Sequence, residues 1–581
     1  MRVDTTKVQD NPRLGWGSDV VAEMLRRLGI EYVCVNPGSS FRGLHDSLIN
    51  YLGNKNPSML LALHEQSVVA IAHGYYKACG KPMAVVLHSN VGLMAGMMSI
   101  FNAWCDRAPI LIFGATGAVD SAVRRSWIDW SHTFRDQGAL VRHFVKWDDQ
   151  PASPAATVDS ILRTYQMVCT PPCGPGYVIL DRRLQEDELV GEIQLPDIQK
   201  FKVPTGLTPS EVAIEQACAM LGSAKRPALL IGRVSSNIDD WKDRVELAEL
   251  LDARVITDLR SGASFPTEHP LHCGPADLFL SPSGAKVLAE SDVVLSLDWP
   301  DLADTLVQAK TSARVIQVSV DSQIHNAFSG DHQRLAPVEL NIPVLPDAVL
   351  KSLIVKFKDR KPVQERAPAQ SRECITEFGD LVPTLADVGL ALSALRQNKK
   401  LCLARVPLNW PAGTYAFREP LDYLGYDGGG GVGSGPGMAV GAALALQGSG
   451  RIPVAIMGDG EFLGAASALW TAAHYQIPVL LIVANNRSYF TDEIQQETVA
   501  RQRQRAVENR WIGQRIDDPP VRIAGLAQDF GVDAEGPITA SKDLRAALQR
   551  GIDAVESGKP YLIDVLIDPT RGGSFDWLAT A

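Results

Sequence analysis

The sequence predicts an α/β protein of three domains, each built around a doubly wound parallel sheet. Short apolar runs alternate with amphipathic stretches along the whole chain, which is typical of parallel sheets covered by helices. A polar connector at 197–210 and a charged, Pro-rich linker at 356–374 divide the chain into three blocks. With 581 residues, the chain is also too long for one hydrophobic core. We therefore expect domains at 1–190, 205–355 and 375–581.

In the first block, strand-like runs are separated by helical stretches such as 65–79. The runs are YVCVNP (32–37), MLLAL (59–63), MAVVLHS (83–89), ILIFGAT (110–116) and YVILD (177–181). Those of the second block are ALLIG (228–232), ARVITD (253–258), VVLSLD (293–298) and ARVIQVSVD (313–321). Apolar runs of this length between helical stretches favour buried strands of a parallel sheet.

Composition and charge exclude several classes of function. The chain is 46% hydrophobic and 21% charged, as in ordinary soluble globular proteins. Its net charge of −10 argues against a nucleic-acid or polybasic membrane-binding surface. Nine cysteines form no CxxC pair, which favours reduced, buried thiols over a zinc site.

The sequence also lacks the usual membrane and export signals. No apolar run approaches the ~20 residues that a membrane span needs. The first residues carry charges of both signs and no apolar core, unlike a signal peptide. We expect a cytoplasmic protein that acts on small molecules and binds neither nucleic acid nor membrane.

The third block contains a motif with chemical meaning, RIPVAIMGDGEFLGAASALWTAAHYQIPVLLIVANNRSYF at 451–490. A strand-like run ends in GDG, a helical stretch follows, and a second run ends in NN. Such a βαβ unit places Asp459 and Asn486 at the carboxyl ends of neighbouring parallel strands, the edge at which open sheets bind ligands. Glycines there let the main chain approach phosphate oxygens, and the helix that follows offers its N-terminal N–H groups to an anion.

An Asp and an Asn at this edge are suited to a magnesium diphosphate. Mg²⁺ prefers an octahedron of oxygen ligands. Asp459 can supply a carboxylate oxygen, Asn486 an amide oxygen and Ser488 its carbonyl, and phosphate oxygens and water would complete the set. The flanking residues expected to contact the same cofactor are Gly458, Gly460, Glu461 and Tyr489.

GDG, followed by 24 residues of βαβ character and then NN, resembles the signature of thiamine diphosphate enzymes. A glycine run lies upstream, DGGGGVGSGPGMAVGAALAL at 427–446. By itself it could be a flexible loop before a helix of small residues. Beside the cofactor motif it favours a loop that contacts the pyrimidine ring through the carbonyl of Gly430 and the amide of Val432. The Val432 side chain would then lie between the two cofactor rings and hold them bent.

Thiamine diphosphate needs a carboxyl group beside N1′ of its pyrimidine, because this group favours the tautomer that acts as internal base. The candidate is Glu65, in MLLALHEQSVVAIAHGYYKA (59–78), where a strand-like run ends and a helical stretch begins. The alternative is a first-turn Glu that complements the helix dipole. Glu65 follows the carboxyl end of a predicted strand, in a chain that also carries a matching cofactor motif. This position favours Glu65 as the carboxyl group beside N1′.

The first block is similar to benzoylformate decarboxylases, one branch of the thiamine diphosphate-dependent 2-oxo-acid decarboxylase and acetolactate synthase superfamily. The matching segments are VNPGSS (35–40), LALHEQSVVAIAHGYYKA (61–78), KPMAVVLHSNVG (81–92), NAWCDRAPILI (102–112), GPGYVILD (174–181) and, in the third block, SALWTAAHYQIP (467–478). The resemblance covers nearly the whole chain and implies pyrimidine-binding, central and diphosphate-binding domains. It also implies dimer pairs that form a homotetramer, with Glu65 reaching the cofactor of the neighbouring subunit.

The resemblance further implies that Ser39 touches the substrate carboxylate and that His88 transfers protons. From the residues alone, Ser39 could be a turn residue and His88 a core histidine. Two positions depart from the family pattern. After VVLSLD the chain continues Trp-Pro-Asp-Leu (299–302), so the second pocket histidine of the family is missing. Asp492 either replaces it in proton transfer or is an exposed acid at a helix start.

The predicted reaction is decarboxylation of a 2-oxo acid, benzoylformate or a related compound, with or without carboligation. The alternative is a lyase or ligase that acts on 2-hydroxy ketones or 2-hydroxyacyl thioesters in the same kind of site. ALLIGRVSSN (228–237) is not a GxGxxG fingerprint, so the sequence does not support a flavin or CoA site in the central domain. A catalytically silent subunit is disfavoured, because Glu65, Asp459 and Asn486 are all present.

Overall fold

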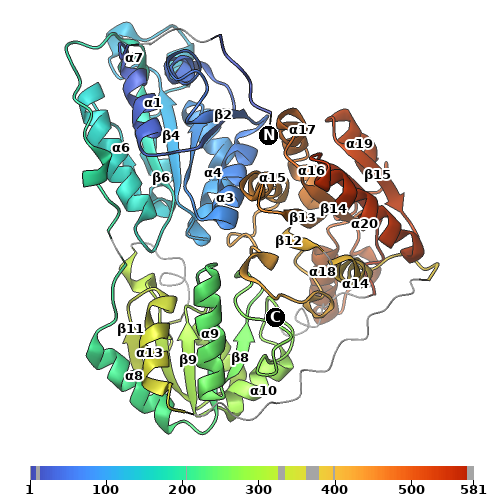
Figure 1. The fold of residues 1–581 in the computed structure, drawn as a ribbon. Coiled ribbons are helices and arrows are strands. Elements are labelled where there is room, and N and C mark those ends of the chain that lie inside the picture. The colour runs from blue at the N-terminus through green and yellow to red at the C-terminus, as the bar shows by residue number, and fades with distance from the viewer. Residues whose placement is uncertain are drawn as a thin grey trace.

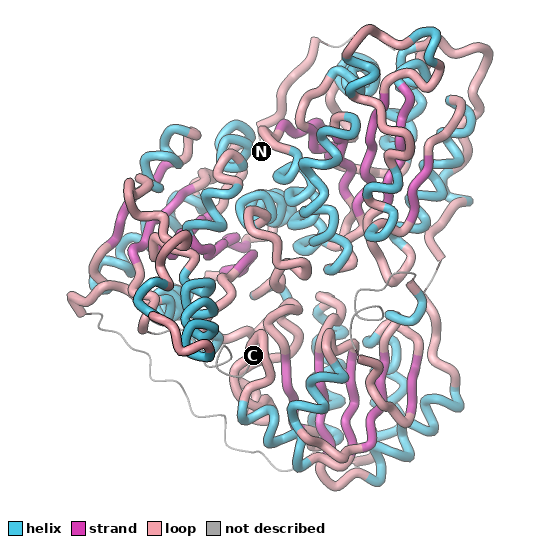
Figure 2. Tube along the Cα trace, turned by 180° about the vertical axis from the view of Figure 1, so that it is seen from behind, coloured by secondary structure: helices cyan, strands magenta, loops and turns pink. Residues whose placement is uncertain are grey.

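The computed structural model describes residues 2–7, 13–204, 206–324, 334–360, 379–396 and 399–571. It forms three lobes, each with one sheet between layers of helices (Figure 1, Figure 2). The paired strands in all three sheets run parallel, which confirms the predicted fold class. Most of the linker at 356–374 lies outside the described residues. In the part of the chain that the structure describes, every helix is too short or too polar to cross a membrane.

The first lobe has a sheet in the order β2-β1-β3-β4-β6-β5. Its strands are β1 (Tyr32–Val35), β2 (Ser58–Leu61), β3 (Met83–Leu87), β4 (Ile110–Thr116), β5 (Trp147–Asp149) and β6 (Gly176–Asp181). Its helices are α1 (Gly17–Arg27), α2 (Arg42–Asp46), α3 (Glu65–Cys79), α4 (Ser89–Cys105), α5 (Ile128–Ser131), α6 (Pro154–Cys169) and α7 (Arg182–Glu186). The edge strand β5 is absent from the predicted runs, because its half-buried WDD has no apolar pattern.

The central lobe has a sheet in the order β11-β10-β9-β7-β8. Its strands are β7 (Pro227–Ile231), β8 (Arg254–Thr257), β9 (Val293–Leu297), β10 (Arg314–Val318) and β11 (Leu340–Ile342). Its helices are α8 (Glu211–Ser223), α9 (Ile238–Leu251), α10 (Pro282–Glu290), α11 (Leu302–Ala309) and α13 (Leu350–Phe357). The strand that the sequence does not predict, β11, is again a short one at the edge.

The third lobe has a sheet in the order β12-β13-β14-β16-β15. Its strands are β12 (Lys400–Arg405), β13 (Arg451–Gly458), β14 (Leu480–Asn485), β15 (Asp533–Ile538) and β16 (Tyr561–Leu566). Its helices are α14 (Leu385–Leu395), α15 (Gly435–Leu446), α16 (Asp459–Gly464), α17 (Ala468–Tyr475), α18 (Phe490–Gln502), α19 (Ile523–Asp529) and α20 (Ser541–Glu556). The single helical stretch predicted after Asp459 is two helices, because Ala465 leaves helical geometry with φ −150°.

Helices α3 and α15 join the first and third lobes (Figure 1). A Cβ atom on Gly74 would lie 2.0 Å from the carbonyl oxygen of Met438, and one on Gly441 would lie 1.9 Å from that of Ile71. The two backbones are therefore in direct contact, which only glycine permits at these positions. The buried small residues of GPGMAVGAALAL make this approach possible along the length of α15.

We expect Gly74→Ala or Gly441→Ala to destabilise the protein by about 3 kcal/mol, because the added methyl group must push the two lobes apart. Urea denaturation of each variant measures the loss. The matched control is Gly222→Ala in α8, where the new Cβ would meet only Phe357 at an ordinary 3.9 Å. It should be neutral or stabilising by up to about 1 kcal/mol. Equal effects of all three substitutions would contradict the close-packing argument.

Candidate active site at the junction of the lobes

The GDG and NN motifs meet at one edge of the third sheet. β13 ends at Gly458 and β14 at Asn485, and the two strands pair in parallel with Gly458 opposite Ala484. Asp459 begins α16, and its carboxylate Oδ1 accepts a hydrogen bond of 3.0 Å from the N–H of Gly460. Asn486 follows β14, and its Oδ1 accepts a bond of 2.9 Å from the N–H of Ser488. The predicted pairing of Asp459 and Asn486 at neighbouring strand ends is thus observed.

The carboxylate of Asp459 is buried in a position that disfavours its negative charge. The residue is only 2% exposed, and its second carboxylate oxygen, Oδ2, is buried without a hydrogen-bond partner among the described residues. Burial raises the pKa of this carboxyl to about 6, although N–H groups that include those of Gly460 and Ser488 partly offset the effect. A buried, unpartnered carboxylate oxygen costs free energy unless a cation or donor approaches it.

The surroundings of Asp459 fit a magnesium ion on a diphosphate. Asp459 Oδ2 and the second lone pair of Asn486 Oδ1 can both bind a cation, and the hydroxyl of Ser488 is occupied by Glu493, which leaves its carbonyl as the third candidate. Within the described ranges, no three His, Cys, Asp or Glu side chains cluster as a metal site. A cation here would therefore need further oxygens from a ligand, as a diphosphate provides.

The glycine residues of the site leave room for such a ligand. A Cβ on Gly458 would meet nothing within 4 Å, and Gly430 has a left-handed φ of +64° with open space beside it. The ring of Tyr489, which is 41% exposed, covers Gly460 so closely that a Cβ there would lie 2.5 Å from it. Val432 is 53% exposed, as a residue that supports a ligand would be in the free protein.

Glu461 has a structural contact that the sequence does not reveal. Its carboxylate accepts N–H bonds from Gly433 (3.1 Å) and Gly435 (2.6 Å), and it lies 3.3 Å from the Arg405 guanidinium. Arg405 in turn donates to the buried Asp427 at 2.5 Å. The side chain of Glu461 therefore fixes the glycine loop, and its position leaves main-chain atoms, not the carboxylate, for contact with a diphosphate.

The first lobe brings Glu65 beside the glycine loop of its own chain, whereas the family resemblance implies contact with the cofactor of a neighbouring subunit. Glu65 is the first residue of α3, it is 8% exposed, and the side chain of its neighbour Gln66 donates a bond of 3.1 Å to the carbonyl of Val432. The carboxylate of Glu65 and the Cβ of His88 both lie within 3.3 Å of the point that a Cβ on Gly92 would occupy. Glu65 and His88 therefore line one space beside the start of α4.

His88 belongs to a polar cluster that sequence reasoning found only in part. Its Nδ1 lies 2.7 Å from the hydroxyl of Ser40, which is 2% exposed, whereas Ser39 is exposed on the same turn. The ring of His132 meets His88 edge to face, with centroids 4.6 Å apart. Neither Ser40 nor His132 stands out in the sequence, because each lies in a turn or loop whose course depends on the folded lobe.

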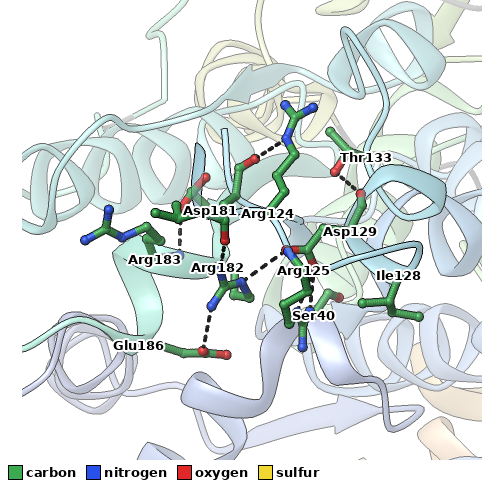
Figure 3. Close-up of polar contacts among 12 residues, drawn as sticks. Ser40, Arg124, Arg125, Ile128, Asp129, Thr133, Asp181, Arg182, Arg183 and Glu186 are labelled. Atoms are coloured by element: carbon green, nitrogen blue, oxygen red, sulfur yellow. Dashed lines mark hydrogen bonds and ion pairs between the residues drawn. The ribbon is translucent and has the colours of Figure 1, made fainter. Parts of the chain in front are cut away.

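The segment that carries His132 is tied down by ion pairs (Figure 3). Asp129, buried in α5, accepts bonds from the N–H and the side chain of Arg125 and lies 3.4 Å from Arg182. Arg182 also donates to the carbonyl of Val123 at 2.9 Å. These contacts fix the connection between β4 and β5 that carries His132.

Asp492 lies exposed in the first turn of α18, where an acid complements the helix dipole. This position agrees with the second of the two interpretations given above, and a part in proton transfer stays a prediction. At the end of β9, where the family resemblance led us to look for a histidine, Asp298 binds Arg107 of the first lobe at 2.7 Å and lies 3.3 Å from Arg233. Burial raises the pKa of Asp298, but the two guanidinium groups outweigh it and the pKa is lowered.

A cavity of about 1010 Å³ lies where the three lobes meet. It reaches the glycine loop at Gly430 and is lined by side chains of the first and central lobes, among them Lys77, Arg107, Arg233 and Lys351. The cavity meets the glycine loop at Gly430, its lining includes both basic residues and the acids Asp106, Asp347 and Asp427, and it does not include Asp459.

Fold and site together define a thiamine diphosphate enzyme. Three models of thiamine pyrophosphate enzymes match the chain: the N-terminal TPP-binding domain at 15–140, the central domain at 214–337 and the C-terminal TPP-binding domain at 408–565. The chain belongs to this family.

Its relatives include two kinds of enzyme. Benzoylformate decarboxylase of Pseudomonas aeruginosa is 26% identical over 94% of this chain and 97% of its own length. A probable acetolactate synthase large subunit of Methanocaldococcus jannaschii is 24% identical over 96% of this chain and 92% of its own length. The solved structure of 4-hydroxybenzoylformate decarboxylase of Rhodococcus jostii has a TM-score of 0.75 at 23% identity, covers 95% of this chain and 99% of that one, and shows the shared fold.

The raised pKa of Asp459 predicts a stability effect that depends on pH. An acid whose pKa is higher in the folded protein than in the unfolded chain lowers stability, in full above about pH 6 and not at all below about pH 4. Without metal, Asp459→Asn should therefore stabilise the protein by up to about 3 kcal/mol at pH 7.5, at roughly 1.4 kcal/mol per pKa unit. The gain should vanish toward pH 4, and Mg²⁺-dependent cofactor binding should be lost.

Urea denaturation in EDTA across pH 4–8 measures the effect. Asp543→Asn, which removes an exposed acid at the start of α20 in the same lobe, is the control and should show no such gain. A stability difference that does not change with pH would count against the burial argument.

Proposed function

We propose that this chain catalyses the decarboxylation of a 2-oxo acid, benzoylformate or a related compound, with thiamine diphosphate and Mg²⁺. The observation that carries the proposal is that Asp459 Oδ2 is buried without a hydrogen-bond partner among the described residues, at a strand end next to that of Asn486. A Cβ on the neighbouring Gly458 would meet nothing within 4 Å. The similarity to benzoylformate decarboxylase over 94% of the chain supports the choice of reaction.

Different residues of the chain would bind the cofactor and transfer protons. When bound, thiamine diphosphate supplies the carbanion that adds to the substrate carbonyl and accepts the electron pair left by CO₂. Asp459, Asn486 and the Ser488 carbonyl would hold Mg²⁺, and Glu65 would hold a proton at the pyrimidine N1′. The low exposure of Glu65 keeps water from competing for that proton.

The polar cluster of the first lobe would handle the substrate. His88, oriented by Ser40, would exchange a proton with the reacting part of the substrate, and the exposed Ser39 on the same turn would contact the carboxylate. Asp492 would take part only if the substrate extends to the start of α18. The walls around the cofactor would be formed by Gly430, Val432, Gly458, Gly460 and Tyr489. Glu461 would fix the glycine loop through its bonds to Gly433 and Gly435.

A second function, a lyase or ligase that acts on 2-hydroxy ketones or 2-hydroxyacyl thioesters, keeps support from one observation. The cavity of about 1010 Å³ reaches the glycine loop at Gly430 and offers room there for the second part of a larger substrate, although Glu65, His88 and Asp459 do not line it. The similarity to acetolactate synthases also favours a carbon–carbon bond-forming outcome. Both functions use the same residues at the cofactor.

We further propose that two copies of the chain pair through the face that surrounds the site. Val91, Met94 and Met98 form an exposed stripe along one side of α4, at 36–46% exposure. Trp127 and Trp130 are 65% and 67% exposed on the segment that Asn90 ties to α4 through the carbonyl of Ser131. So large an apolar surface beside a cofactor site favours burial by a second copy. A homotetramer would be a pair of such dimers.

Release of CO₂ from a panel of aromatic, branched and short 2-oxo acids, with thiamine diphosphate and Mg²⁺, tests the function. We expect release from at least one acid, lost without the cofactor, and Glu65→Gln should lower its rate by about 10²–10⁴-fold while the cofactor still binds. The control is Glu31→Gln, an exposed acid of the same lobe that should leave the rate unchanged. If none of the acids releases CO₂, the lyase or ligase is favoured. An unchanged rate in Glu65→Gln would contradict the role of Glu65.

Sedimentation velocity tests the dimer face. Met94→Asp should convert the assembly to smaller species and reduce cofactor-dependent activity, because a charge in a buried apolar interface is strongly unfavourable. Val212→Asp, at a 64% exposed apolar residue on α8 of the central lobe, should leave the assembly intact. If Met94→Asp keeps the mass of the wild-type assembly, α4 does not form the interface.

A further inference from the structure

His132 is the nearest ring to His88, although it lies 44 positions further along the chain and outside every predicted motif. The two imidazoles meet at 4.6 Å between centroids with an interplanar angle of 83°. On its other side His88 is fixed by Ser40, 2.7 Å from Nδ1, and by the backbone of Gly38, where a Cβ would lie 2.3 Å from the His88 ring. His88 is therefore held between Ser40, Gly38 and His132.

The backbone of His132 is fixed on both sides. It ends the short helix α5, where its N–H donates to the carbonyl of Ile128 at 3.0 Å. The carbonyl of the preceding Ser131 accepts a bond from Asn90 of α4. The hydroxyl of the following Thr133 donates to the carbonyl of Asp129, which is itself anchored by Arg125 and Arg182 (Figure 3). The position of the ring is thus part of the ordered structure of the lobe.

One atom of His132 is left without a partner. Its Nδ1 is buried and makes no hydrogen bond to the described residues. A buried imidazole nitrogen of this kind costs free energy that a well-packed loop would normally avoid. An atom of this kind next to a reactive side chain is a candidate for a functional role.

The surroundings of His88 lower the pKa of its imidazole. Burial has the largest effect, His132 and Arg125 on the segment before α5 lower the pKa further, and Glu65 at the start of α3 raises it in part. Ser40, which contacts Nδ1, carries no charge, and the charge of Asp129 on α5 is paired with Arg125. Two imidazoles in contact resist carrying two protons at once, so a proton on one disfavours a proton on the other.

We propose that His132 is a positioning residue for His88: its ring fixes the plane of His88, and the contact between the two imidazoles disfavours a proton on His88, which favours the neutral form that can accept a proton during the reaction. The pair thereby supplies, from within the first lobe, the second imidazole that the end of β9 does not provide. The catalytic consequence of this inference rests on the proposed function. The effect of His132 on the protonation of His88 is a property of the protein without cofactor or substrate.

The test measures the protonation of His88 directly. The rate at which diethyl pyrocarbonate modifies His88, followed by peptide mass spectrometry between pH 5 and 8.5, gives the midpoint of its titration in the cofactor-free protein. In both His132→Gln and His132→Phe we expect the midpoint to rise by roughly 0.5–1 pH unit, because the neighbouring imidazole no longer disfavours a proton on His88. His143→Gln, at an exposed histidine of the same lobe, is the control and should leave the midpoint unchanged.

The two substitutions separate electrostatics from packing. Phenylalanine keeps an aromatic ring against His88, so a residue that only packs would be replaced by it without effect. A midpoint unchanged in His132→Phe would overturn the proposal. If the wild-type enzyme releases CO₂, its pH–kcat/KM profile can be compared with those of the two variants. The limb that reports His88 should shift to higher pH in both variants, as the titration midpoint does. A shifted midpoint in a protein that decarboxylates no 2-oxo acid would uphold the histidine pair and reject the proposed function.

Discussion

The direct contact between α3 and α15 is the constraint on which the arrangement of the site depends. α3 begins at Glu65, and α15 begins directly after the glycine loop that contains Gly430 and Val432. Because Gly74 and Gly441 let the two backbones touch, the beginnings of both helices are fixed relative to each other. The bond from Gln66 to the carbonyl of Val432 lies at that end. One helix crossing therefore joins two lobes and sets where Glu65 stands beside the loop.

Several buried polar groups around the loop carry unfavourable or strongly paired charges. Asp459 keeps an oxygen without a partner, whereas Arg405, Asp427 and Glu461 compensate one another and the N–H groups of the loop. The difference has a physical meaning, since paired charges hold a loop in place, whereas an oxygen without a partner among the described residues remains available to a ligand. The third lobe thus combines a fixed glycine loop with oxygens that a cation could bind.

The first and central lobes divide their polar residues differently. In the first lobe, the ion pairs of Asp129 with Arg125 and Arg182 fix the connection that carries His132. At the end of β9, the corresponding strand-end position of the central lobe is used by Asp298 to bind Arg107 across the lobe boundary. A strand end that secures the contact between lobes cannot also present a free imidazole to a substrate. Glu65 and His88, to which we assign proton transfer in the proposed function, both lie on the first lobe.

The sequence by itself determined the three parallel sheets, the start of α3 at Glu65, and the pairing of Asp459 with Asn486, because these follow from local periodicity and from the rule that parallel strands end at one edge. It did not reveal β5, whose residues have no apolar pattern, the three-residue β11, the strands β12, β15 and β16 of the third sheet, or the break between α16 and α17. Only the tertiary structure placed Ser40 and His132 around His88 and turned Glu461 toward Gly433 and Gly435. These contacts join residues on separate loops, and their positions are set by packing between elements, which leaves no periodic pattern in the chain.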